Sequence, residues 1–146
     1  MTTIEELAAR LELKELVDRF AIESDENNLE AYREMFTADC QVKIYFNHQL
    51  GMDLNSIDEL IEAFEGFGTP KDSFHFSGLQ VVDFQDDTHA SGQWYLLASL
   101  VDEVEGKELL TTNRVRCEDS YVKDAGQWRI AKREQNFVFS DTKELA

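Results

Sequence analysis

His75 is the side chain of this sequence best suited to acid–base chemistry, and it lies in the stretch SFHFSG at residues 73–78. Imidazole is the group that most often takes up or delivers a proton near neutral pH. His75 could therefore be a general base, or it could be a half-buried strand residue bonded to the backbone or to a serine. Successive strand residues alternate between faces, and both faces here are apolar, so the pattern leaves the direction of His75 open.

Two further polar side chains fall within apolar strand patterns. Asn113 shares a face with Val115, where its amide could bind a substrate oxygen or pair across the strands. Arg133 lies where the alternation of the last predicted strand changes phase, which indicates a bulge near residues 131–134. Its guanidinium could bind a carboxylate or brace Asp25, or it could be an exposed charge.

Apolar side chains predict the walls of a pocket near these polar groups. Trp94 and Leu96 share a face with Ala90 and Ala98, and we assign that face to the interior. Trp94, Leu96 and Val115 are the residues expected to hold a hydrophobic substrate.

Neither histidine nor cysteine spacing predicts a metal site or a disulfide framework. His48 and His89 lie in or beside predicted turns, and Cys40 and Cys117 are far apart in the chain. We therefore expect no metal and no cofactor, with Cys117 as a small core residue.

The charge of the chain argues against several classes of partner. Its 14 basic and 30 acidic residues give a net charge of −16, which repels nucleic acid and anionic membrane surfaces. No apolar run approaches the roughly 18 residues of a membrane span, and the N-terminus does not resemble a signal peptide. We expect a cytoplasmic protein with one domain at residues 1–146.

The first third of the chain predicts helices, because apolar residues recur at three- and four-residue spacings. Residues 4–11 and 13–21 form two apolar stripes that point to nearly opposite sides at about 100° per residue. The helix is therefore expected to kink near Glu12 or to bury different sides at its two ends. Thr3 and Glu6 form the expected capping pair at its start.

The remaining elements follow from caps and alternation. A short helix is expected at residues 29–36 after a cap at Asn27, and another at residues 57–64 after a cap at Ser56. Strands are expected at residues 40–46, 52–54, 73–85, 88–102, 108–123 and 127–139. Four long strands joined by hairpins, with helices mainly at the front, predict an α+β fold.

Three stretches carry a resemblance to a known family. They are DENNLEAYREMFTADCQV at residues 25–42, DDTHASGQWYL at residues 86–96 and DAGQWRIAKR at residues 124–133. With the order of the elements, they resemble the SnoaL-like branch of the nuclear transport factor 2-like superfamily. The resemblance implies a cystatin-like, curved mixed sheet that wraps around N-terminal helices and forms a cone-shaped pocket.

The resemblance also implies site residues. Dehydratase and dehydrochlorinase members have an Asp just after the first long helix and a His at the start of the first long strand, and these match Asp25 and His75. The Asp orients the His, which removes a proton. A pocket-facing Arg in such members matches Arg133. Several members have a Tyr or Lys five residues before the Asp, whereas this chain has Phe20, which we count among the pocket residues.

These observations predict a cofactor-independent lyase or isomerase that acts on a hydrophobic small molecule. Phe20 favours an alternative, a non-catalytic domain that binds a hydrophobic ligand, because the usual third polar group is missing. A third alternative is an assembly module, since proteins that this chain resembles commonly pair through the outer face of the sheet. In each case we expect a homodimer or a higher homo-oligomer.

Overall fold

The computed structural model describes residues 1–145. Its elements, in chain order, are α1 (Thr3–Asp25), the 3₁₀ turn η1 (Leu29–Ala31), α2 (Tyr32–Met35), β1 (Phe36–Phe46), β2 (Gln49–Leu54), α3 (Ile57–Gly66), β3 (Asp72–Phe84), β4 (His89–Val104), β5 (Lys107–Asp124) and β6 (Gln127–Glu144).

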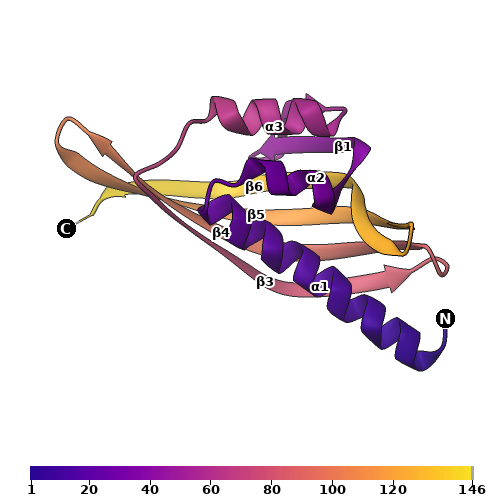
Figure 1. Cartoon of the computed structure of the whole chain (residues 1–146). Helices are drawn as coiled ribbons and strands as arrows, with labels where there is room; N and C mark the ends of the chain where they lie inside the picture. The colour runs from indigo at the N-terminus through magenta and orange to yellow at the C-terminus, as the bar shows by residue number, and fades with distance from the viewer. Residues whose placement is uncertain (146) are drawn as a thin grey trace.

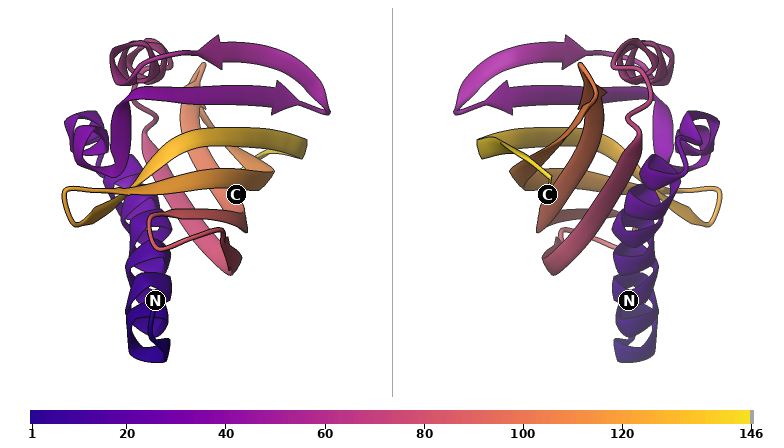
Figure 2. Two further views of the ribbon diagram at one scale, coloured as in Figure 1. Left: turned by 90° about the vertical axis from the view of Figure 1, so that its right-hand side faces the viewer. Right: turned by 90° about the vertical axis from the view of Figure 1, so that its left-hand side faces the viewer.

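All the strands join one curved sheet in the order β2-β1-β6-β5-β4-β3. β1 and β6 are parallel, and the other neighbours are antiparallel. The helices lie together on the concave side of the sheet (Figures 1 and 2). The predicted fold, an α+β arrangement of a curved mixed sheet around N-terminal helices, is confirmed.

Helix α1 is continuous and buries one side along its length. Its N-cap is Thr2, one residue before the predicted cap, and Thr2 and Glu5 form the capping box. The expectation of a kink or of burial on two sides is wrong, because Ile4, Leu7 and Leu11 are exposed. This stripe lies on the side of the helix away from Ala9, Leu13 and Val17, which are buried.

The other two predicted caps differ in outcome. Ser56 caps α3, because its side chain accepts a hydrogen bond from the N–H of Glu59. The predicted cap at Asn27 is wrong, since Asn28 precedes η1 and makes no capping bond with its side chain. Asn27 instead adopts a φ of 54°, a left-handed conformation that ends the long helix.

The core lies between α1 and the concave face of the sheet. Leu13, Val17 and Phe20 of α1 pack against Trp94 of β4 and Ile130 of β6, and each is at most 3% exposed. Burying a large apolar side chain contributes about 1.5–3 kcal/mol. This packing fixes the C-terminal half of α1 against the sheet.

Bulges change which face the residues of a strand occupy. The register of β3 and β4 shifts at Leu79, which has a φ of 39°. His75 and Val82 therefore both face the concave side, although one number is odd and the other even. On β6 the register shifts at Ala131, which confirms the bulge predicted near residues 131–134.

Candidate functional site

Asp25 and His75 meet where the last turn of α1 reaches the start of β3. Oδ1 of Asp25 lies 2.7 Å from Nδ1 of His75. A carboxylate only accepts hydrogen bonds, so Nδ1 carries the proton and Nε2 keeps its lone pair. Among residues 1–145, no hydrogen bond uses Nε2. The His75 side chain is 16% exposed, so its free nitrogen lies near the surface of the concave side.

Asp25 also covers the free edge of the sheet. β3 is an edge strand, and the backbone N–H of His75 donates to both Asp25 oxygens at 2.9 and 3.1 Å. Oγ of Ser73 donates to the same carboxylate at 3.1 Å. An unpaired edge N–H would be open to pairing with another chain. One carboxylate thus orients the ring of His75 and satisfies its backbone.

Two hydroxyl groups hold the turn of α1 that carries Asp25. Oγ of Ser24 donates to the carbonyl of Phe20 at 2.6 Å and lies 2.5 Å from the hydroxyl of Tyr32. Because Ser24 has a single hydroxyl proton, Tyr32 donates in the second bond. Burial raises the pKa of Tyr32 to about 12, so the phenol keeps the proton that it donates.

Phe20 brings an aromatic ring to the interior of the cone. Its ring centroid lies 5.0 Å from that of Tyr32 in a stacked pair and 6.2 Å from that of Trp94 in an edge-on pair. Phe20 is 3% exposed. This part of the interior is therefore filled by packed rings.

A buried acid that sequence reasoning missed, Asp119, lies beneath these rings. Its carboxylate accepts hydrogen bonds from Nε and Nη2 of Arg133 at 2.8 and 2.9 Å. It also accepts from Nε1 of Trp94 at 2.9 Å and from the hydroxyl of Tyr121 at 3.0 Å. The signal was present in the sequence, because Asp119 continues the inward alternation of β5 between Cys117 and Tyr121.

Arg133 pairs with Asp119 and not with Asp25, so the expectation that it braces Asp25 is wrong. Aromatic faces enclose the rest of its guanidinium. Its guanidinium carbon lies 4.5, 4.8 and 5.1 Å from the ring centroids of Phe20, Trp94 and Phe36. Burial alone would lower the pKa of Arg133, but the ion pair with Asp119 outweighs burial and raises it. The cation is therefore permanent, and its charge is balanced inside the core.

Asn113 lies on the concave face of β5, further toward the open end of the cone. The register places His75, Ala98, Asn113 and Ser140 in one row across β3, β4, β5 and β6. Oγ of Ser140 donates to Oδ1 of Asn113 at 2.6 Å. In the part of the chain that the structure describes, no hydrogen bond uses Nδ2 of Asn113.

The three predicted apolar wall residues face the interior and are packed. Trp94, Leu96 and Val115 are at most 3% exposed. The structure thus groups Phe20, Trp94 and Arg133 in a solid core, and it places His75 and Asn113 nearer to solvent. Asp25 joins His75 directly.

Residues 1–145 contain no cluster of histidine, cysteine and acidic side chains arranged to hold a metal ion. His48 and His89 are exposed, whereas Cys40 and Cys117 are free and buried. Burial raises the pKa of both thiols, which disfavours the thiolate. No helix among these residues is long and apolar enough to cross a bilayer.

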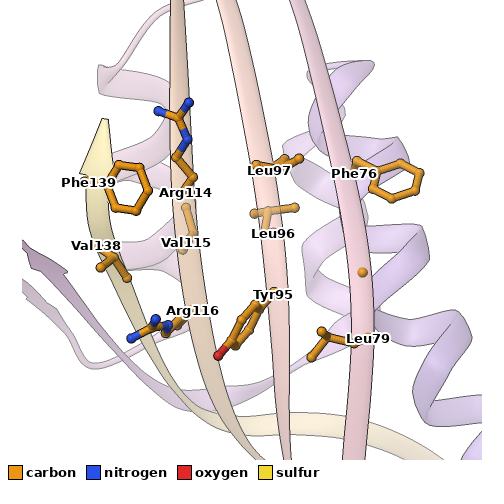
Figure 3. Close-up of a pocket in the computed structure, with 11 residues that line it drawn as sticks. Phe76, Leu79, Tyr95, Leu96, Leu97, Arg114, Val115, Arg116, Val138 and Phe139 are labelled. Atoms are coloured by element: carbon orange, nitrogen blue, oxygen red, sulfur yellow. The ribbon is translucent and has the colours of Figure 1, made fainter. Parts of the chain in front are cut away.

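The convex face of the sheet carries an exposed apolar surface, which we call the outer apolar surface. It consists of Phe74, Phe76, Leu79, Val81, Tyr95, Leu97 and Phe139. Figure 3 shows most of these side chains around a hollow of about 410 Å³, with Arg114 and Arg116 beside it. Each of the apolar residues is at least 43% exposed.

The sequence profile of the SnoaL-like domain matches residues 5–134, which is most of the chain. The protein belongs to the SnoaL-like family. None of the curated proteins searched matches it significantly. Family membership fits the curved sheet and the helices on its concave side.

Solved structures agree with this SnoaL-like fold. A candidate scytalone dehydratase from Novosphingobium aromaticivorans is 20% identical, with a TM-score of 0.84 over 99% of this chain and 94% of that one. The hexachlorocyclohexane dehydrochlorinase LinA-type3 from Novosphingobium barchaimii is 14% identical, with a TM-score of 0.79 over 99% and 95%. A candidate aromatic ring hydroxylase from N. aromaticivorans is 16% identical, with a TM-score of 0.80 over 95% and 94%. At these identities the likeness concerns the fold.

Proposed function

We propose that this protein is a cofactor-independent lyase or isomerase in which His75 removes a proton from a carbon atom of a hydrophobic small molecule. The observation that carries the proposal is the 2.7 Å hydrogen bond from Nδ1 of His75 to Asp25, with Nε2 free. This is the arrangement of a base and its orienting acid. Related folds that include a dehydrochlorinase and a candidate dehydratase support the same reaction class.

The reaction follows from the protonation state of the ring. Nε2 takes a proton from carbon, and the electron pair of the C–H bond either expels a neighbouring leaving group or moves toward a carbonyl oxygen. The imidazolium that forms is stabilised by Asp25, which does not need to take up the proton. A positioned general base contributes about 10²–10⁴-fold to the rate.

A test can use a probe whose only chemical requirement is a base. The ring of 5-nitrobenzisoxazole opens when one proton is removed from carbon, and the N–O bond breaks to give a coloured phenolate. We expect the wild-type protein to open this ring about 10²-fold or more faster than His75→Gln. The exposed His89 provides the matched control, and His89→Gln should retain the wild-type rate. Equal rates for wild type and His75→Gln would refute the proposed base.

The outer apolar surface supports a second function, the assembly of copies of this chain. Phe74, Phe76 and Phe139 are each at least 58% exposed, and the interior beneath Phe20 is packed. A second copy is the favoured occupant on charge. Arg116 lies beside the hollow, and Glu118 and Glu134 follow on the same convex face, so a two-fold pair can bring arginine to glutamate.

Sedimentation tests the assembly directly. We expect wild type to sediment as a dimer or higher oligomer, and Phe76→Glu to sediment as a monomer with an unchanged far-ultraviolet circular dichroism spectrum. Leu11→Glu, on the exposed stripe of α1, is the matched control and should leave the oligomer intact. A monomeric wild type at all accessible concentrations would refute the second function without affecting the first.

A further inference from the structure

We propose that the site takes an uncharged carbonyl compound, that Nδ2 of Asn113 donates to its oxygen, and that Ser140 is the positioning residue for that amide. The inference rests on the proposed function, since His75 would supply the base. It assigns the oxygen to Asn113 instead of Arg133.

Most hydrogen-bond donors around Asp119 in the interior are already engaged. Asp119 takes the N–H of Trp94, the hydroxyl of Tyr121 and two donors of Arg133. The remaining nitrogen of Arg133, Nη1, is buried and has no hydrogen-bond partner among residues 1–145, within a side chain that is 1% exposed. These donors are thus unable to reach a molecule that enters from solvent.

Asn113, in contrast, can be reached from solvent, and its amide group is still able to donate a hydrogen bond. It is partly exposed, and its carbonyl oxygen is occupied by the hydroxyl of Ser140 at 2.6 Å. An amide has one accepting and one donating end, so this bond leaves Nδ2 to donate. Two residues further along the same strands, Thr111 and Thr142 lie with their hydroxyls 2.9 Å apart and bond each other. Within the row of His75, Ala98, Asn113 and Ser140, the amide of Asn113 is therefore the group that can donate a hydrogen bond to a substrate.

The position of Asn113 relative to the base suits one small molecule. His75 pairs with Ala98, and Ala98 pairs with Asn113. Two cross-strand steps separate the Cα atoms of His75 and Asn113 by about 10 Å. The residue between them contributes only a methyl group. Both side chains reach toward the same part of the concave face, so one substrate can contact the base and the amide.

Charge selects an uncharged substrate. Arg133, the one buried cation among residues 1–145, is neutralised by Asp119, and Asp25 adds a negative charge beside His75. The whole chain carries −16. A carboxylate would meet repulsion without a free cation, whereas a ketone needs only a neutral donor. When His75 takes the proton beside the carbonyl, the electron pair of the C–H bond moves onto the oxygen, where the N–H of Asn113 stabilises the charge.

Two probes with the same ring system test the inference, 2-acetylnaphthalene as the ketone and 2-naphthoate as the carboxylate. Binding is measured by calorimetry, and the side-chain amide of Asn113 is followed by NMR. We expect the wild type to bind the ketone at least about tenfold more tightly than the carboxylate, with a shift of the Asn113 amide resonances. Ser140→Ala should weaken ketone binding about five- to tenfold, the size of one neutral hydrogen bond, and leave the carboxylate unchanged.

Two further variants test whether Ser140 positions the amide of Asn113 or only stabilises the fold. Ser140→Thr keeps the hydroxyl and should restore ketone binding, and Thr142→Ala should stay within about twofold of wild type. Tighter binding of naphthoate, no ketone binding up to its solubility limit, or equal effects of Ser140→Ala and Thr142→Ala would overturn the inference. The two proposals fail separately: equal ring opening by wild type and His75→Gln refutes the base, whereas absent ketone binding to the wild type refutes the carbonyl site.

Discussion

Asp119 and Arg133 form a bidentate ion pair in the interior, with both side chains at most 1% exposed. Their partners come from neighbouring strands of the sheet and from the ring of Phe20 on α1. The pair therefore joins the sheet to the helix that carries Asp25.

We predict that Asp119→Ala lowers the free energy of unfolding by about 3–5 kcal/mol, because it leaves Arg133 charged and buried without a partner. Urea unfolding followed by fluorescence measures the change. The exposed pair of Asp141 with Arg114 gives the matched control, since Asp141→Ala should change stability by less than about 1 kcal/mol. Similar losses for the two variants would contradict a structural role for the buried pair.

A second prediction concerns alkaline stability. Burial raises the pKa of Tyr32 from 10.0 to about 12. Between these pH values the unfolded chain loses the phenolic proton and the folded chain keeps it. The contribution of Tyr32 is therefore complete below about pH 10 and is lost as the pH rises to about 12, at ~1.4 kcal/mol per pH unit.

Tyr32→Phe should remove the part of the decline in unfolding free energy with pH that comes from Tyr32. Unfolding free energies at several pH values above 9 measure it, and Tyr95→Phe, at an exposed tyrosine, should leave the wild-type slope. At pH 8, Tyr32→Phe should lose about 1 kcal/mol, because the bond to Ser24 is gone. An identical slope in Tyr32→Phe and wild type would exclude the expected titration.

Asp25→Asn should affect both stability and reactivity. The amide can donate where the carboxylate accepted, so the bonds from His75 and Ser73 are not all retained, and we expect a loss of about 1–3 kcal/mol. Opening of 5-nitrobenzisoxazole should slow at least about tenfold, because the tautomer of His75 is no longer fixed. Glu26→Gln, at the exposed C-cap of the same helix, should change neither quantity by more than experimental error.

The exposed stripe of α1 should tolerate polar substitution. Leu7→Gln should change stability by less than about 0.5 kcal/mol, because Leu7 is 57% exposed, whereas Leu13→Ala should cost about 2–5 kcal/mol. Thermal and urea unfolding of the two variants compare the sides of the helix. A large loss for Leu7→Gln would mean that a partner covers this stripe.

The sequence predicted most elements because periodicity and caps agree. The cap at Ser56 and the alternation of β1, for example, both appear in the structure. The stripe of Ile4, Leu7 and Leu11 was misread as buried, since its pattern matches that of a packed helix. Periodicity shows that a face is apolar, but it does not show whether another element covers it.

Two features of the site could not be predicted from the pattern. The direction of His75 depends on the bulge at Leu79, which changes the face occupied by every residue before it. The pairing of Asp119 with Arg133 depends on the register between β5 and β6, which Ala131 shifts. In both cases one extra residue decides which side chains meet, and neither residue has a distinctive type.

The hydrogen bond from the backbone N–H of His75 to Asp25 allows the assembly of the site to be measured without a substrate. An amide proton held by a hydrogen bond exchanges with deuterated solvent only when that bond opens. Since the same carboxylate holds Nδ1 of the ring, the exchange rate of this one backbone proton reports how often α1 separates from β3. Native-state exchange at His75 would therefore measure the fraction of time in which the site is assembled, before any substrate has been identified.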